Sequence, residues 1–289
     1  MTQTLQPQHG PLYFAWRRFA ANKAAVVSGL VLLVLVLMAI FAPLITKTNY
    51  DEQSFLTDAY AAPSSTYWFG VDDLGRDFFS RIVYGSRISL TIGFSSALFS
   101  VLIGIPLGAA AGYYGGTVDW AVMRLIELFS VVPSLLAAML LGALTGGGFL
   151  TIVLVAALFG WVQVCLLVRA QVKAVREKEF VRAAQALGAS PGYIMRRHLI
   201  PNSVSPIIVG FVLAIPLAMM LEASLSFLGI GVPPPLPSWG QMINVGMNFM
   251  YFYWHLAVFP TAALAITVLA TTLFGDGLRD ALDPTLKGR

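Results

Sequence analysis

Long uninterrupted apolar runs constrain this chain more than any other feature of its sequence. An α-helix needs about 20 apolar residues to cross the hydrocarbon core of a bilayer. Backbone groups in lipid must be satisfied internally, so only helices and closed β-barrels can span it. Barrel strands alternate apolar and polar residues over about 10 positions, whereas the runs here are continuous. The sequence therefore predicts an all-α, polytopic membrane protein.

The composition supports this class. Hydrophobic residues make up 57% of the 289 residues and charged residues only 11%, against about 25% charged residues in an ordinary soluble domain. So few charges cannot cover the surface of a water-soluble globule. The single cysteine, Cys165, lies inside an apolar run, so it forms no intramolecular disulfide, and we interpret it as a small packing residue.

We expect six transmembrane helices, with boundaries accurate to a few residues. The first apolar run is too long to be a cleaved signal, so it is interpreted as an uncleaved span. The expected spans are residues 24–46, 88–112, 118–141, 149–168, 204–226 and 254–275. The resulting organisation is an N-terminal tail 1–23, the first span 24–46, an outer segment 47–87, a five-helix core 88–275 that contains a loop at 169–203, and a C-terminal tail 276–289.

The positive charges predict the orientation. Cytoplasmic segments of membrane proteins carry an excess of Lys and Arg. The two tails and the loop 169–203 hold 13 of the 18 Lys and Arg residues, whereas the outer segment 227–253 holds none. We therefore expect both termini and the loop 169–203 in the cytoplasm, and the segment 47–87 on the periplasmic side.

The N-terminal tail leaves two alternatives open. Leu12, Trp16 and Phe19 recur at helical spacing beside two arginines, as in helices that lie on a membrane surface. An unstructured tail that contains aromatic residues fits the same pattern.

The loop 169–203 carries strong helix signals. Residues 171–187 predict an amphipathic helix, and Gly188 ends it because glycine readily takes the left-handed conformation. The residues that fall near one face of this helix are Val172, Val175, Phe180, Ala184 and Leu187. Ser190 then serves as N-cap with Pro191 at the first helical position, and Pro201 is expected to end this second helix. A two-residue turn would suffice to join two spans, so two ordered helices indicate a surface on which a partner docks.

This loop resembles the "EAA" loop of ABC importer permeases. Arg182-Ala183-Ala184, Gly188 and Pro201 lie at the spacing of that motif. Further strings are similar to the dipeptide/oligopeptide/nickel permeases, in the subunit type with an extended first outer loop. They are Phe69–Asp77 with Ser80–Leu90, Glu222–Gly229, Pro233–Gly240 and Gly275–Pro284.

The resemblance implies a fold like that of type I ABC importer permeases and a place in the bacterial inner membrane. It also implies four kinds of partner: a second permease that forms a heterodimer with this chain, two cytoplasmic ATPase subunits, a periplasmic or lipid-anchored substrate-binding protein, and membrane lipid. Nucleic acid is not expected. The sequence contains no Gly-Lys dipeptide and hence no phosphate-binding loop. We therefore expect no enzyme activity and no cofactor in this chain, with ATP and Mg²⁺ bound by the partner subunits.

In the family this loop is the coupling helix that fits a cleft on the ATPase. Arg182 replaces the family's glutamate, and we expect its side chain to pair with Glu179 one turn earlier. The residues expected to form the docking surface are Arg182, Ala183, Ala184, Gly188, Ser190, Pro191, Tyr193, Arg196, Arg197 and Pro201.

Charged and proline residues within spans suggest function, because a charge in lipid is costly. Arg124 and Glu127, three residues apart, are interpreted as a structural ion pair. Glu222 leaves two alternatives: a carboxylate that reaches interfacial water, or a cavity-facing group at an outer gate. Pro133 and Pro216 could kink their helices and line a pathway.

Other features are interpreted structurally. Gly104, Gly108 and Gly112 form a small-residue stripe, which we expect to pack within this chain. Trp239 fits the membrane interface after a stiff proline stretch at 233–237. Asp72, Asp73 and Asp77 lack the spacing of a calcium loop. They are interpreted as turn and helix-cap residues with Arg76 and Arg81 as partners, and no metal site is expected.

The sequence thus predicts a permease subunit of an ABC importer for dipeptides or oligopeptides. Nickel complexes or glutathione-like molecules are alternative substrates within the same family. A stand-alone secondary transporter would favour repeated halves, and none is visible. A membrane enzyme is remote, because His9, His198 and His255 are scattered and no catalytic motif accompanies them.

Overall fold

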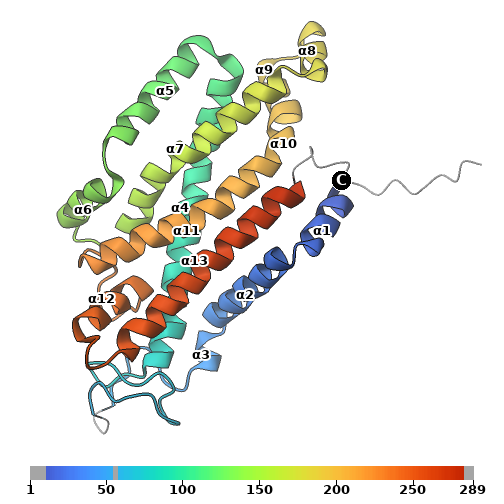
Figure 1. The fold of residues 1–289 in the computed structure, drawn as a ribbon. Helices are drawn as coiled ribbons and strands as arrows, with labels where there is room; N and C mark the ends of the chain where they lie inside the picture. The colour runs from blue at the N-terminus through green and yellow to red at the C-terminus, as the bar shows by residue number, and fades with distance from the viewer. Residues whose placement is uncertain (1–10, 55–57, 283–289) are drawn as a thin grey trace, which may run out of the picture.

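The structure is a computed structural model that describes residues 11–54 and 58–282, with residues 11 and 12 described by their backbone alone. Within these ranges the chain is helical and contains no β-strand. Five helices are long and apolar enough to cross a membrane, and they lie side by side in one bundle (Figure 1). They are α2 (Lys23–Ile40), α4 (Phe78–Tyr114), α7 (Phe149–Arg176), α11 (Val204–Phe227) and α13 (His255–Leu282).

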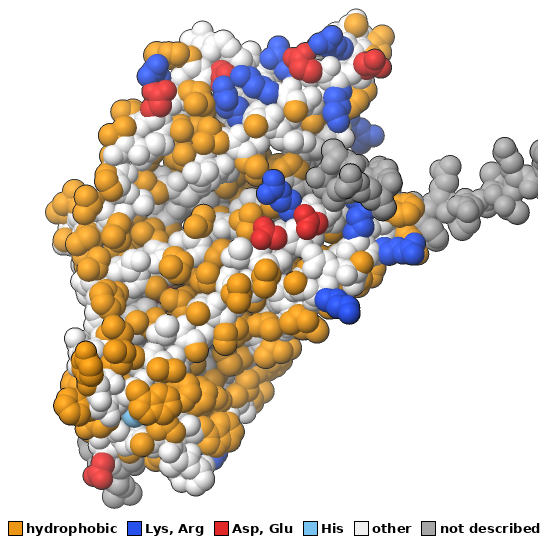
Figure 2. All heavy atoms as spheres, viewed as in Figure 1, with side chains coloured by type: hydrophobic (Ala, Val, Ile, Leu, Met, Phe, Trp, Pro, Cys, Tyr) orange, Lys and Arg blue, Asp and Glu red, His pale blue; other side chains and the backbone are white. Residues whose placement is uncertain are grey.

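Shorter helices complete the two ends of the bundle. At one end, called the α8 end here, lie α8 (Glu179–Ala186), α9 (Pro191–Ile194), a widened π turn (Met195–Leu199) and α10 (Ile200–Asn202). At the opposite end, the α12 end, residues 47–54 and 58–77 cover the bundle beside α12 (Trp239–Phe249) (Figure 1). Lys and Arg gather mainly towards the α8 end, whereas hydrophobic side chains cover most of the remaining visible face (Figure 2). This division is the one expected for a protein whose middle lies in lipid.

The expected third span, 118–141, is broken in the structure. Helix α5 (Gly116–Val131) and helix α6 (Ser134–Thr145) meet at an angle of 77°. Proline lacks the N–H that would continue the helix and clashes with the preceding turn, so Pro133 ends up as the N-cap of α6. Instead of kinking one helix, Pro133 separates two, and the pair has the length and composition of a sixth span only when both helices are taken together.

Several other boundaries also differ from the expected ones. The side chain of Asp77 accepts the N–H of Ser80 at 3.0 Å, and this N-cap starts α4 ten residues before position 88. The predicted helix 171–187 is two helices, because α7 runs on to Arg176 and α8 starts at Glu179. The first apolar run ends in a separate helix, α3 (Ala42–Ile45), and α13 extends to Leu282.

The N-terminal segment is helical. Helix α1 covers Pro11–Ala21. Of the two alternatives, a helix or an unstructured tail, the chain therefore forms a helix over this range. Trp16 stacks on Phe19 with ring centroids 6.2 Å apart, and Phe19 packs edge-on against Phe274 of α13 at 5.5 Å. Phe19 therefore ties α1 to the bundle, while Trp16 remains largely exposed. The side chain of Leu12 lies outside the described residues.

The glycine stripe of α4 lies in close contact with α7. A Cβ on Gly108 would lie 2.5 Å from the carbonyl oxygen of Cys165 in α7, and one on Gly112 would lie 2.8 Å from that of Arg169. At Gly104 the nearest atoms, 2.8 Å away, belong to the side chain of Val164. Only glycine lets two helix backbones approach this closely, so the stripe packs within this chain, against α7.

Trp239 is enclosed by the protein and is not exposed to the surroundings of the bundle. Its side chain is completely buried, its indole N–H donates to the carbonyl oxygen of Ile82, and its backbone N–H donates to the hydroxyl of Ser89. Trp239 is the first residue of α12, a helix that packs against α4 and for which the sequence carried no expectation. A buried indole needs a hydrogen-bond partner, and α4 supplies it.

Candidate functional site

The polar loop at the α8 end, from Glu179 to Asn202, has a defined helical structure and is called the platform here. Gly188 has φ +78° and allows the chain to reverse after α8, while the N–H of Ala189 donates to the carbonyl of Ala184 at 3.1 Å. The hydroxyl of Ser190 then accepts the N–H of Tyr193 at 3.4 Å, with Pro191 in the first turn of α9. These contacts are those of a helix C-cap followed by an N-cap.

A hydrophobic cluster anchors this platform to the bundle. Val181 of α8, Ile194 of α9 and Leu199 are fully buried against Val172 and Val175 at the end of α7. Burial of such side chains stabilises an arrangement by about 1.5–3 kcal/mol each. The platform is therefore held by packing, and the side chains opposite this cluster are free to meet a partner.

Leu187 is the outermost apolar side chain of the platform, with 87% of its surface exposed. The sequence analysis placed it on the apolar face together with Val172 and Val175. That expectation was wrong because α8 ends at Ala186 and the turn swings Leu187 away from the bundle. Leu187 is therefore exposed beside Gly188, at a place that the helical pattern did not indicate.

The cationic residues of the platform are exposed. Arg182 donates to Glu177 at 2.6 Å, not to Glu179 as expected, because Glu177 precedes α8 and can face back along it. This hydrogen bond and the charge of Arg182 lower the pKa of the Glu177 carboxyl. Arg196 donates to the carbonyl of Gly192 at 3.3 Å. Ala183, Ala184 and Arg197 complete the surface: Ala183 and Arg197 are exposed and Ala184 is half-buried.

Pro201 does not end the second helix. The chain remains helical to Asn202, because the π turn Met195–Leu199 widens the helix and Pro201 falls in the first turn of α10. Proline is tolerated there, since the first turn uses no N–H of its own. The rings of Phe180 and Tyr193 flank the imidazole of His198 at 5.9 and 5.8 Å.

Asp119, Arg169 and Lys173 form an ion-pair cluster that the sequence did not predict. Asp119, near the start of α5, accepts two hydrogen bonds from the guanidinium of Arg169 and one from Lys173 at 3.0 Å. Such a bidentate contact is strong and directional. It connects α5 to α7 just below the platform. Fifty residues separate Asp119 from Arg169, so no local spacing could have indicated the pair.

A cavity of about 530 Å³ opens between α4, α6, α7 and α11. Most of the residues that line it are apolar, and none of them is charged. The polar exceptions are the hydroxyl residues Ser100 and Ser134 and the carboxamide residue Gln163. The side chain of Gln163 is exposed and makes no hydrogen bond within the described part of the chain. The cavity therefore has a mainly apolar lining with one long polar side chain, that of Gln163.

The three predicted pathway residues lie outside this lining. Glu222 is fully buried; one carboxyl oxygen accepts the hydroxyl of Ser226 at 2.7 Å and the other has no hydrogen-bond partner. It neither reaches interfacial water nor faces the cavity. Pro216 is buried inside α11, and Pro133 is exposed one residue before Ser134.

Arg124 and Glu127 form an ion pair on α5, with 58% and 50% of their side-chain surfaces exposed. The guanidinium of Arg124 also lies over the ring of Trp120, 5.7 Å from its centroid. The buried residues of α5, Val122 and Ile126, lie on the opposite face. The pair therefore points away from this chain's core.

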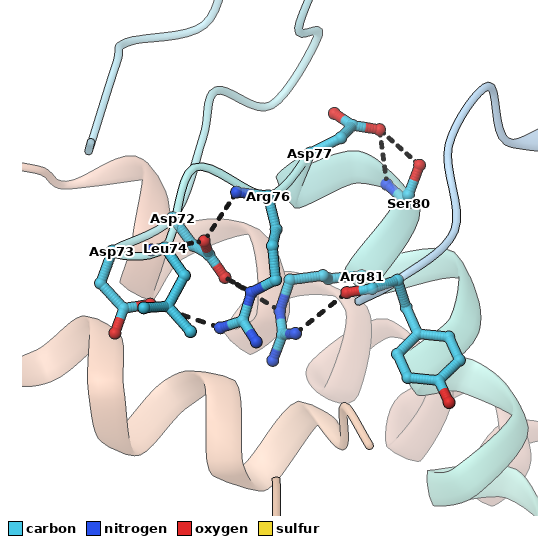
Figure 3. A network of polar contacts seen from close by, with 8 residues as sticks. Asp72, Asp73, Leu74, Arg76, Asp77, Ser80 and Arg81 are labelled. Atoms are coloured by element: carbon cyan, nitrogen blue, oxygen red, sulfur yellow. Dashed lines mark hydrogen bonds and ion pairs between the residues drawn. The ribbon is translucent and has the colours of Figure 1, made fainter. Parts of the chain in front are cut away.

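The acidic residues of the segment 47–77 form a compact network with two arginines (Figure 3). Asp72 accepts the backbone N–H and the guanidinium of Arg76, at 2.9 and 2.7 Å, and pairs with Arg81 at 3.2 Å. Asp77 caps α4. The interpretation as turn and cap residues is confirmed. Among the described residues, no group of His, Cys, Asp and Glu could hold a metal ion.

Two family models match the sequence. Residues 104–288 match the "binding-protein-dependent transport system inner membrane component" model, and residues 11–63 match the "N-terminal TM domain of oligopeptide transport permease C". The first match covers the platform, the cavity helices α7 and α11, and the bent pair.

The chain is similar to three characterised relatives along nearly its whole length. It is 41% identical to the oligopeptide transport system permease protein OppC of Bacillus subtilis, over 94% of this chain and 89% of the relative. It is 42% identical to the dipeptide permease DppC of the same organism (94% and 85% covered). It is also 42% identical to the glutathione permease GsiD of Pectobacterium atrosepticum (94% and 90%).

The fold is similar to that of solved transporter subunits. An inward-facing structure of the MetNI methionine ABC transporter matches with a TM-score of 0.59 and 18% identity, over 71% of this chain and 97% of the other. An amino acid ABC transporter crystallised with histidines matches with a TM-score of 0.56 and 17% identity, over 70% and 94%. At such identities the likeness concerns the fold alone.

Proposed function

Because this chain belongs to the family of binding-protein-dependent transport system inner membrane components, we propose that it is one of two permease subunits in an ATP-driven peptide importer. The second, related permease would complete the pathway. Two cytoplasmic ATPases would drive the cycle, and a periplasmic or lipid-anchored binding protein would deliver the substrate. In this assembly both termini and the α8 end face the cytoplasm of a bacterium, in accord with the excess of Lys and Arg there.

The observation that carries the proposal is the platform at the α8 end. Two short helices stand on a buried apolar cluster and present Leu187 and Tyr193 outward. Large apolar side chains that are exposed together on an ordered surface are typical of a protein contact. The ATPases would grip this platform, and their closure would move the permease helices as rigid bodies.

Peptides are the proposed substrate because the oligopeptide and dipeptide permeases match over nearly the whole chain. A glutathione-like peptide is a second candidate, since the glutathione permease is equally similar. The uncharged lining of the cavity suits both, because it opposes no particular side-chain charge.

The turn at Gly188 offers the test. Its φ of +78° strains any β-branched residue, so Gly188→Val should displace Leu187 and uncouple ATP hydrolysis from peptide uptake. The matched control is Gly192→Ala, because Gly192 has an ordinary φ and no neighbouring atom within 4 Å. ATP hydrolysis and uptake would be measured in proteoliposomes that contain the whole complex. Full coupling in Gly188→Val would contradict the docking role of the platform.

A further inference from the structure

Gln163 lies at the midpoint of α7, which spans Phe149–Arg176. Thirteen or more residues of helix separate it from either end, or about 20 Å at 1.5 Å per residue. Its side chain is exposed in the cavity, where most of the other lining residues are apolar. The carboxamide therefore lies within the apolar stretch of α7, six residues or about 9 Å along the helix before Arg169.

An amide group in such apolar surroundings needs hydrogen-bond partners. Moving an amide from water into a hydrocarbon medium without a partner costs roughly 4–8 kcal/mol. No described residue of this chain bonds to the Gln163 carboxamide. The neighbouring hydroxyl of Ser100 is occupied, since it donates to the carbonyl of Ser96 at 2.8 Å. The partner must therefore come from outside this chain, as water, as a molecule in the cavity or as a group of the second permease.

The chemistry of the cavity lining limits the class of ligand that can bind there. A carboxamide offers one acceptor oxygen and two N–H donors, which match the N–H and the carbonyl of a peptide group. A site with no charged side chain favours neither a positive nor a negative ligand. In pockets of this kind, a few polar groups among apolar walls set orientation and specificity.

We propose that Gln163 hydrogen-bonds the peptide group of the substrate as it passes through the cavity and is thereby a specificity-determining residue of the pathway. This inference rests on the proposed function, since it assigns the peptide contact within the pathway of the same importer. The residue recognises the backbone that all peptides share, and the apolar wall accommodates varied side chains.

Accessibility to water is the first test, and the chain offers a clean background because it has a single cysteine. Gln163→Cys, made together with Cys165→Ala in the assembled complex, should react with a charged methanethiosulfonate reagent that does not enter lipid. The control is the native Cys165, two residues away and fully buried, which should remain unlabelled. Mass spectrometry of this subunit would locate the label. A Gln163→Cys variant that does not react with the reagent would overturn the proposal.

The second test is transport of alanine oligomers of two to five residues by the reconstituted complex. Gln163→Leu should reduce the uptake kcat/KM roughly three- to tenfold, the factor supplied by one hydrogen bond of ordinary strength. The matched control is Gln171→Leu, on the same helix but outside the cavity lining, which should transport normally.

Substrates with an N-methylated peptide bond identify the contact. They lack the N–H that would donate to Gln163, so the wild-type complex should import them more slowly than the parent peptides, and Gln163→Leu should import both at the same rate. Equal discrimination by both proteins would refute the contact. Loss of heterodimer assembly in Gln163→Leu would instead identify the residue as a subunit contact, and would also overturn the proposal. If the wild-type complex imports none of the oligomers, the proposed function fails, while the labelling result still decides whether Gln163 faces water.

Discussion

Trp239 of α12 donates its indole N–H to the carbonyl oxygen of Ile82 in α4 at 3.0 Å, and its side chain is entirely buried. The contact joins residues that are 157 positions apart in the sequence. It fixes α12, which follows the proline stretch, to the start of the longest helix. Because the surroundings are apolar, this hydrogen bond is protected from competition with water.

Replacing Trp239 by Phe should therefore destabilise the protein by about 1–3 kcal/mol, because the carbonyl loses a buried donor and the smaller ring leaves a gap. The thermal midpoint of the purified complex would measure the loss. Trp120→Phe is the control, since Trp120 is 61% exposed on α5 and should shift the midpoint little. Equal shifts for both variants would show that the buried contact contributes no special stability.

Gly108→Ala should weaken the contact between α4 and α7. The added Cβ would lie 2.5 Å from the carbonyl oxygen of Cys165, and a backbone atom cannot move aside without shifting the helix. Overpacking of this kind costs about 1–3 kcal/mol.

The comparison variant for Gly108→Ala is Gly210→Ala. The atom nearest to a Cβ there is the tip of the Leu167 side chain, which can change its position. Thermal unfolding should separate the two, with the smaller loss in Gly210→Ala. The reverse order would contradict the close approach of α4 and α7.

Asp72→Ala should be the more damaging of two neighbouring substitutions in the segment 47–77. Asp72 is 5% exposed and pairs with both Arg76 and Arg81, so its removal leaves two buried guanidinium groups without their main partner. Breaking a buried pair costs about 3–5 kcal/mol. Limited proteolysis at the α12 end would report the loosened segment.

Asp73 provides the matched control. Its side chain is 38% exposed and meets Arg76 only at 3.4 Å. Exposed ion pairs contribute about 0–1 kcal/mol, so Asp73→Ala should resist protease nearly as well as the wild type. If both variants are cut at the same rate, the two ion pairs do not differ in strength.

The sequence predicted features that depend on composition and local signals. Continuous apolar runs indicated the spans, the turn at Gly188 and Ser190 appeared as expected, and Asp72 paired with Arg76. These features require only knowledge of neighbours along the chain. The family could also be identified, because its motifs are short strings at defined spacings.

The errors arose where distant segments decide the outcome. Hydropathy places Trp239 in an apolar or interfacial environment, but it cannot show that α4 covers the ring. Glu222 was expected to reach water or a cavity, yet Ser226 and the packing around α11 enclose it. No pattern in the sequence distinguishes Gln163, because only the arrangement of four helices shows that it faces a cavity.

Helix α7 runs without a proline or a break from the cavity to the residue that precedes the Glu177 turn. Closed backbone hydrogen bonds make such a rod stiff. If the proposed ATPases displace the Arg176 end of α7, Gln163 at its midpoint moves with the helix as part of one rigid body. The residues of α7 that line the cavity would then change position together with the helix, without a series of side-chain rearrangements between the platform and the cavity.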